Sequence, residues 1–340
     1  MSGLTLQVHG NRQGRQDGRR KDAAGDEEGA QVGEERRGYA FVFIAGVIWG
    51  LIGPFMATMG ACGASVELTA FLRVAFAFLF MLPITVAKFG AGSLRVDAKT
   101  LVASMALGLV CHGIYNVLYA CSVELSGVAT ASVLLNVAPI VGLAASVLFF
   151  GEAASGVKVL AVVIDIVGCA LVVTGGNFTA LEFSVFGVAA GAGAGVCYAM
   201  AALIVRAAGS SANPFVISTY SYLFASAFCF VFLQAQGAPV QLNVPLLVVG
   251  AGMGLFPTAI AYVLYYYGVE RIRETSRVPV IASVETVIAA LFGAFVYHEG
   301  MGPVAVVGIV LVIASIALMS WRRRPPASPA LRAGTRRPPQ

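Results

Sequence analysis

The sequence predicts an all-α polytopic membrane protein, with ten transmembrane helices arranged as two inverted five-helix repeats. Three observations predict this fold: the composition, a succession of long apolar runs, and a pattern that occurs twice. Hydrophobic residues make up 58% of the chain and charged residues only 11%, whereas an average soluble domain has about 25% charged residues. This composition is typical of a chain that is surrounded by lipid rather than water.

The apolar runs follow one another from Tyr39 to Trp321. Each has roughly 20 residues, which is the length that a helix needs to cross a hydrocarbon core of roughly 30 Å. Glycine, proline, asparagine and charged residues separate the runs. The predicted helices comprise residues 39–60, 67–89, 100–123, 127–150, 157–174, 185–207, 214–233, 245–268, 276–297 and 303–321.

The repeated pattern runs from a tyrosine to a glutamate. Tyr119 precedes Glu152 by the same distance as Tyr266 precedes Glu299, and the residues between them are almost all apolar. The second copy follows the first by 147 residues. Internal repeats in a polytopic membrane protein indicate transport, with the binding site where the repeats meet.

The distribution of positive charge orients the helices. If the first loop is external, the external loops near residues 60–66, 124–126, 175–184, 234–244 and 298–302 contain no lysine or arginine. The cations of the remaining loops then share one side, which the positive-inside rule identifies as cytoplasmic. We therefore expect a multi-pass protein of the cell (inner or plasma) membrane with both termini in the cytoplasm. Because each half contains an odd number of helices, the second half must enter the membrane from the opposite face.

Four segments follow from this division. Residues 1–38 are rich in charge and contain no apolar stretch, so they are expected to form a disordered cytoplasmic tail. Residues 39–174 form the first five-helix repeat and residues 185–321 the second. Residues 322–340, rich in proline and arginine, are expected to form another disordered cytoplasmic tail.

Other classes of function find no support in the sequence. The basic residues lie mainly in tails and short loops, which argues against nucleic-acid binding. Three histidines and six scattered cysteines provide no metal-ligand spacing, and the enzyme motifs HExxH, GxSxG and the Walker loop are missing from the sequence. We therefore expect neither an enzyme nor a cofactor.

Several motifs resemble those of one family. The chain is similar to the EamA-type, ten-helix members of the drug/metabolite transporter superfamily over residues 39–321. The matching features are Trp49-Gly50 and Pro54, Arg73, the run from Leu134 to Pro139 that leads to Gly151-Glu152, and the run from Ser283 to Leu291 that leads to Glu299. Thr286 stands where the family usually has proline, and His298 where glycine is common, which leaves open whether the ninth helix is kinked.

The resemblance implies a secondary transporter of a small metabolite, an amino acid or a drug-like compound. Many similar proteins are exporters thought to be driven by the proton gradient, and some take substrate up. The partners are then a small-molecule substrate, the lipid bilayer and protons, for a monomer or a homodimer. The alternative is a receptor or assembly factor that keeps the fold without transporting.

A polar stripe in the third helix indicates where substrate binds. His112, Tyr115, Asn116 and Tyr119 lie at i, i+3, i+4 and i+7, so they share one helical face. That face is costly in lipid and should point to protein or to a water-filled cavity. The repeat offset places Tyr262 and Tyr266 in the equivalent positions of the eighth helix. Alternatively, Tyr119 and Tyr266 are interfacial anchors, and His112 and Asn116 form interhelical hydrogen bonds.

Glu285 is the acid of greatest interest, because it lies inside the ninth helix rather than in a loop. A carboxylate there needs a cation, water or a proton, which makes it a candidate group for binding a proton or a substrate amine. Arg73 and His112 are its candidate partners, and a structural ion pair is the alternative. Asp165 in the fifth helix is expected to bond a neighbouring helix or a second protomer. Glu152 is expected to stabilise the start of that helix.

We therefore predict a site near the middle of the bilayer, lined by helices 1, 3, 4, 6, 8 and 9. The predicted substrate-binding residues are Trp49, Tyr115, Asn116, Tyr119, Asn136, Tyr198, Tyr262 and Tyr266. The predicted proton-coupling residues are Glu285, His112 and Arg73. Glycines spaced by four, such as Gly46 and Gly50, are expected to allow close helix packing.

Overall fold

The computed structural model describes residue 29 and residues 31–320, except for 182–183, 210–212 and 299. The described residues form helices and loops and contain no strand, which confirms the all-α prediction. Nine described helices are long and apolar enough to span a membrane, and Ala138–Phe150 is a shorter apolar helix. Glu299 and most of the two expected tails lie outside the described residues.

The elements follow a helix at residues 31–49. In chain order they are α2 (Ile52–Ala61), α3 (Val66–Phe89), η1 (Ala91–Leu94), α4 (Ala98–Ala106), η2 (Leu107–Ile114), α5 (Tyr115–Leu135), α6 (Ala138–Phe150), α7 (Gly156–Thr174), η3 (Phe178–Ala180), α8 (Val185–Ala208), α9 (Pro214–Ala235), α10 (Val244–Met253), η4 (Gly254–Ile260), α11 (Ala261–Arg271), η5 (Thr275–Arg277), α12 (Val278–Ala282), α13 (Val284–Val296) and α14 (Pro303–Ser320).

The first span begins at Gln31, earlier than residue 39, the start that the apolar run predicts. The additional turns are held by packing and charge. Glu34 accepts a hydrogen bond of 3.1 Å from Arg271 at the end of α11, and Tyr39 donates one of 2.9 Å to Glu35. Residues 31–38 are thus helical in the structure, although most of their side chains are exposed.

A turn inside α5 separates the third span from the fourth. Gly127 has φ 75° and ψ 161°, a backbone conformation that is essentially restricted to glycine. Tyr119 and Ser132 lie on either side of it, and their hydroxyl oxygens are only 3.2 Å apart. A straight helix would separate residues at that spacing by roughly 20 Å, so the chain reverses at Gly127. The fourth span then continues through α6, which gives ten spans among the described residues.

The two halves of the chain share the same interruptions. The third span contains a π-helical segment, η2, and the eighth contains another, η4, which starts 147 residues later, at Gly254 instead of Leu107. Helices also break at equivalent places, before α6 at Asn136 and before α13 at Ser283. The interruptions therefore recur at the spacing of the repeated sequence pattern. The hydropathy of the chain does not reveal these interruptions.

The ninth span is interrupted even though Thr286 replaces the proline that stands at Pro139 in the first half. The break falls at Ser283, between α12 and α13. The other departure, His298, has a φ of 54°, and the equivalent Gly151 has a φ of 65°. His298 therefore adopts the left-handed conformation that glycine adopts more readily.

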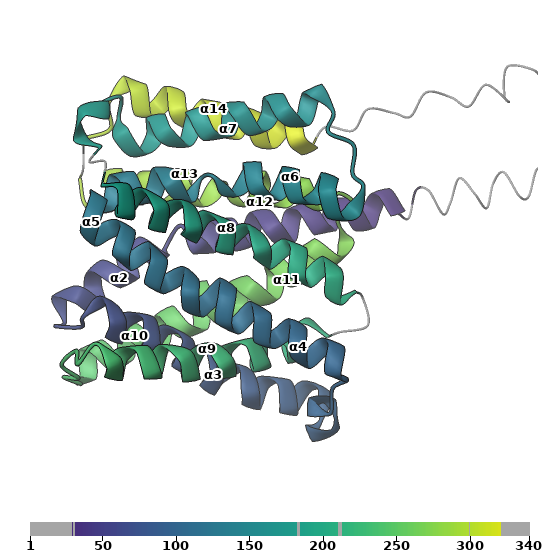
Figure 1. The fold of residues 1–340 in the computed structure, drawn as a ribbon, viewed down its shortest axis with the longest axis vertical. Helices are drawn as coiled ribbons and strands as arrows, with labels where there is room; N and C mark the ends of the chain where they lie inside the picture. The colour runs from purple at the N-terminus through teal and green to yellow at the C-terminus, as the bar shows by residue number, and fades with distance from the viewer. Residues whose placement is uncertain (1–28, 30, 182–183, 210–212, 299, 321–340) are drawn as a thin grey trace, which may run out of the picture.

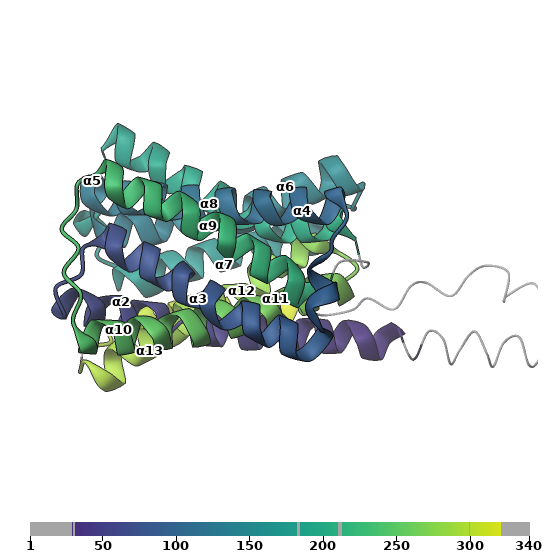
Figure 2. The same cartoon turned by 90° about the horizontal axis from the view of Figure 1, so that it is seen from below.

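The helices lie side by side along one direction, and the first and last described residues are at the same end of the bundle (Figure 1). α7 and α14 form an outer pair, and α3, α9 and α10 lie on the opposite side (Figures 1 and 2). A Cβ atom on Gly168 of α7 would lie 2.9 Å from Val312 of α14. Glycine thus allows the backbones of the outer pair to approach closely.

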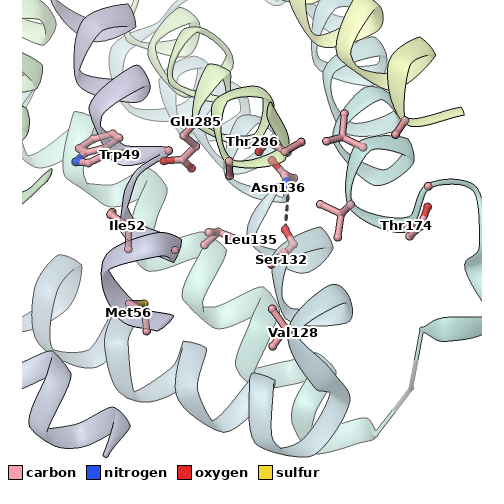
Figure 3. Close-up of a pocket in the computed structure, with 18 of the residues that line it drawn as sticks. Trp49, Ile52, Met56, Val128, Ser132, Leu135, Asn136, Thr174, Glu285 and Thr286 are labelled. Atoms are coloured by element: carbon pink, nitrogen blue, oxygen red, sulfur yellow. Dashed lines mark hydrogen bonds between the residues drawn. The ribbon is translucent and has the colours of Figure 1, made fainter. Parts of the chain in front are cut away.

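The helix at residues 31–49 packs against the interrupted ninth span in the same way. A Cβ atom on Gly46 would lie 2.6 Å from Val284, and one on Gly50 would lie 2.5 Å from Ile288. Both distances are too short for a side chain, so only glycine fits. This close approach brings Trp49 and Glu285 to one region of the bundle (Figure 3).

Candidate functional site

A cavity of about 650 Å³ lies among the helices, a size that suits a small organic ligand. Figure 3 shows part of its wall, with Trp49 and Glu285 on one side and Asn136 and Ser132 on another. Of the predicted site residues, the cavity is lined by Trp49, Arg73, Tyr115, Asn116, Tyr119, Asn136 and Glu285. These side chains come from distant parts of the sequence, so the fold brings them together.

The cavity extends from these side chains to one end of the bundle. Its wall includes Thr174 and Gly175 at the end of α7, and residues 300–302 in the loop before α14. The start of α7 lies at the opposite end of the bundle, since a helix of this length spans roughly 28 Å. The lining residues therefore connect the interior to one end of the molecule only.

An aromatic cluster packs around Trp49. The Trp49 ring centroid lies 4.7 Å from that of Tyr262, 5.0 Å from that of Tyr265 and 5.9 Å from that of Tyr198. Tyr115 stacks on Tyr119 with centroids 6.0 Å apart. Contacts of this kind fix the ring orientations, so the cavity has a rigid aromatic wall.

Arg73 and Glu285 bring opposite charges to the cavity. Arg73 is buried, and its Nε donates a hydrogen bond of 3.1 Å to the Thr258 hydroxyl. Among the described residues, the ion pairs do not include one between Arg73 and Glu285. The two charges thus line one space without neutralising each other by direct contact.

The two asparagines of the wall stabilise the backbone where helices are irregular. The Asn116 side-chain amide donates to the carbonyl oxygen of His112 in η2. The Asn136 amide donates to the carbonyl oxygen of Ser132 at 2.8 Å, beside the break before α6 (Figure 3). Each amide therefore donates to the carbonyl four residues earlier, next to an irregular part of its helix.

Four of the predicted residues lie outside the cavity wall: His112, Tyr198, Tyr262 and Tyr266. His112 and the tyrosines at 262 and 266 are each at most 4% exposed. The His112 ring packs edge-on against Tyr262, with centroids 4.5 Å apart, and its Nε2 lies 3.4 Å from the Tyr266 hydroxyl. Together they form the support behind Trp49 rather than the surface of the cavity.

The helices that line the cavity also differ from those expected. The sixth and eighth spans contribute no lining residue among those described, whereas α3, α7 and α14 contribute Arg73, Val172 and Ala305. Ser132, Thr286, Met56 and Ile52 also line the cavity. These residues are small or apolar, so the sequence gives no signal that separates them from ordinary packing residues.

An ionic network joins separate elements at the opposite end of the bundle. The Glu152 carboxylate accepts hydrogen bonds from the Thr275 backbone N–H at 2.6 Å, from the Ser276 hydroxyl at 2.5 Å and from Lys158 Nζ at 3.3 Å. Lys158 also lies 2.8 Å from Glu274. Glu152 therefore connects the α6–α7 junction to η5, in addition to lying before the first turn of α7.

Glu274 completes this network from the loop before η5. It accepts a hydrogen bond of 2.6 Å from Arg277 Nε. Burial raises the pKa of the Glu274 carboxyl, but the hydrogen bond from Lys158 and the charge of Arg277 outweigh burial, so the net pKa lies below its ordinary value of 4.5. The carboxylate is thus ionised at neutral pH and holds both cations.

Comparison with known proteins identifies the family. The model of the EamA-like transporter family matches residues 36–174 and again residues 185–321. The chain belongs to the EamA-like transporter family. It is therefore a multi-pass membrane transporter, as the resemblance of its motifs implies.

Individual relatives agree with this assignment. An uncharacterized transporter of Archaeoglobus fulgidus is 28% identical over 289 residues, which cover 84% of this chain and 97% of that protein. A solved crystal structure has a similar fold, with a TM-score of 0.72 at 16% identity, over 83% of this chain and 97% of the other. Each similarity thus extends over nearly the whole length of the relative.

Proposed function

We propose that this protein is a secondary active transporter that moves a small organic molecule across the cytoplasmic membrane by alternating access, coupled to protons. One observation carries the proposal: the cavity with Arg73 and Glu285 extends to only one end of the bundle, while the Glu152 network ties the other end together. A transporter caught with its site accessible from one side has this arrangement.

The cavity supports a substrate with an apolar or aromatic body and charged ends. Trp49, Tyr115 and Tyr119 offer aromatic faces, against which a ring or an alkyl group packs. Arg73 suits a carboxylate, because a guanidinium donates two parallel hydrogen bonds to it. Glu285 suits an ammonium group. Among small metabolites, amino acids and drug-like compounds, this wall therefore favours a molecule with both an amine and a carboxylate.

Glu285 is our candidate for proton coupling. It lies in the first turn of α13, beside the break at Ser283, and it lines the cavity. A carboxyl group that binds either a proton or a substrate amine couples the two by competition. Arg73, which lines the same cavity, is the better of the two candidate partners, since His112 packs against the tyrosines and does not line the cavity.

The positive-inside rule supports a cytoplasmic location for the Glu152 network and for both termini. The cavity then faces outward, and the recurrence of π-helical segments and helix breaks at the spacing of 147 residues supports two inverted repeats. In the inward-facing state the Glu152 network would separate and the outer end would close. This exchange is the alternating access that the proposal requires.

A receptor or assembly factor that keeps the fold is the competing function. A dry, fully packed interior would favour it. A cavity of about 650 Å³ lined by an arginine, a glutamate and two asparagines favours transport instead, because such groups are costly within a bilayer unless they serve a site.

Flux measurements in proteoliposomes test the proposal. A panel of amino acids, amines and aromatic compounds would be assayed with and without a pH gradient. One proton moving down about 100 mV supplies roughly 2.3 kcal/mol, enough for about a fiftyfold concentration ratio. We expect gradient-dependent flux of at least one amine-bearing compound. Failure of every compound to move would contradict the transport function, and flux without any response to the gradient would contradict proton coupling.

A further inference from the structure

A fully buried acid lies outside the cavity wall. Asp165 is in the middle of α7 and is 0% exposed. The middle of a helix that spans the membrane lies roughly 13 Å from either end, near the centre of the hydrocarbon core. An ionised carboxylate at that depth is costly unless cations or hydrogen-bond donors surround it.

Two serine hydroxyls contact one oxygen of this carboxyl group. Ser283, at the break between α12 and α13, lies 2.6 Å from Asp165 Oδ1, and Ser315 of α14 lies 2.7 Å from the same atom. Among the described residues, the buried Oδ2 has no hydrogen-bond partner. The group is therefore held through one oxygen only.

The short contacts around Asp165 need more protons than the two serine hydroxyls provide. The Ser283 oxygen also lies 2.7 Å from the Val280 carbonyl oxygen, and the Ser315 oxygen lies 2.8 Å from that of Val312. The two hydroxyls thus have two protons for four short oxygen–oxygen contacts. A proton on Asp165 Oδ1 supplies a third: it is donated to one serine, which donates to its carbonyl, while the other serine donates to Oδ1.

The described elements that pack on α7 supply no positive charge. α6, α12 and α14 contain no charged residue, and the charged residues of α5 and α13 are the acids Glu124 and Glu285. The cation of α7 itself, Lys158, pairs with the acids of the Glu152 network. The described ion pairs do not include Asp165. The titratable neighbours are Cys169, one turn along α7, and Glu285 of α13, and neither offers a positive charge. An added negative charge at Asp165 would be unfavourable beside Glu285.

We propose that Asp165 is a proton-binding site that joins α7, the α12–α13 break and α14 through Ser283 and Ser315. When the proton leaves, the O–H bond of the carboxyl breaks, and the proton passes to water that enters from the cavity. Thr286, which lines the cavity, follows Ser283 closely in the chain. The presence of a proton on Asp165 does not depend on the proposed function. A role for this proton in transport does rest on the proposed function.

Loss of this proton has a structural consequence. The carboxylate then requires water, which enters only if the junction around Ser283 loosens. Because Ser283 precedes α13, the loosening reaches Glu285 in the first turn of that helix. Asp165 thereby links the outer helix pair to the interrupted helix of the substrate cavity.

Infrared spectroscopy of the purified protein tests the site without any substrate. At neutral pH we expect a C=O stretching band of a protonated carboxylic acid in the wild type and in Glu285→Gln, and its loss in Asp165→Asn. Retention of the full band in Asp165→Asn would overturn the proposal. So would a band that appears only when N-methylglucamine replaces sodium, because the site would then hold a cation instead of a proton. A failure of transport would leave this test unaffected.

A second pair of variants keeps the carboxyl group in place. Ser315→Ala removes one hydrogen bond to Asp165, so we expect the frequency of the band to shift. Ser146→Ala is the matched control, since Ser146 of α6 is buried and its hydroxyl has no hydrogen-bond partner among the described residues. We expect no shift in the control. An identical spectrum for Ser315→Ala and the wild type would contradict the assignment.

Discussion

At the scale of single residues, Trp49 provides a fluorescence probe of the cavity. The chain contains two tryptophans; Trp49 lines the cavity, and Trp321 lies outside the described residues. A Trp321→Phe variant therefore retains one tryptophan, in the wall of the proposed site. A ligand that packs against the aromatic wall should change the fluorescence of that residue, which provides a binding assay that does not depend on transport.

Arg73→Gln should weaken the binding of a ligand that carries a carboxylate. Hydrogen bonds to charged groups contribute about 1.5–3 kcal/mol, so we expect the dissociation constant to rise roughly tenfold to a hundredfold. The measurement is titration of Trp49 fluorescence in the Trp321→Phe background. An amine that lacks a carboxylate serves as the control ligand, and its affinity should change little. Equal losses for both ligands would indicate general damage to the site.

The sequence predicts part of the site at this scale. The sequence predicts Trp49, Tyr115 and Glu285 because polar and aromatic groups are conspicuous within apolar runs, and these residues line the cavity. The repeat offset predicts Tyr262 and Tyr266, yet they lie behind the wall. The offset identifies equivalent positions in two helices, but each helix packs in its own surroundings, so equivalence does not determine which of them faces the cavity.

At the scale of elements, the turn at Gly127 determines how many spans the chain has. Gly127→Ala would place a Cβ atom on a residue with φ 75° and ψ 161°. Backbone conformations of this kind cost about 1–3 kcal/mol for other residues. We expect the variant to lose that amount of unfolding free energy, measured by denaturant titration in detergent micelles.

Gly53→Ala is the control for that prediction. Gly53 lies inside α2 with open space around its Cα and without a positive φ, so alanine should be neutral or slightly stabilising there. A loss of stability at Gly53 as large as the loss at Gly127 would contradict the role assigned to the turn.

The apolar runs predict the helices themselves well, because the length and hydropathy of a span follow directly from bilayer thickness. Irregularities within spans are harder to predict. The segments η2 and η4 and the break at Ser283 depend on contacts with other helices, such as the packing of Gly46 on Val284. These contacts explain why the ninth span is interrupted even though residue 286 is not proline.

At the scale of the whole molecule, the Glu152 network holds one end of the bundle together. Its Glu274 carboxyl has a pKa below the ordinary value of 4.5 in the folded protein. The ionised form is therefore favoured by folding, so its contribution is present above pH 4.5 and is lost as the pH falls through the lower, folded-state pKa.

Glu274→Gln should remove this part of the pH dependence. Because Glu274 is 32% exposed, we expect a loss of at most about 1 kcal/mol at neutral pH and a smaller decline of stability below pH 4.5 than in the wild type. Thermal unfolding followed from pH 7 to pH 3 provides the measurement. Parallel curves for the two proteins would show that the network does not stabilise this end.

The central claim is that Glu285 couples protons to transport through the one-sided cavity. The most direct test is flux driven by a pH gradient in proteoliposomes that contain wild type, Glu285→Gln or Glu124→Gln, where Glu124 is an exposed acid on α5. We predict that Glu285→Gln abolishes the response to the gradient while Glu124→Gln retains it. A Glu285→Gln variant with the flux and pH dependence of the wild type would contradict the claim.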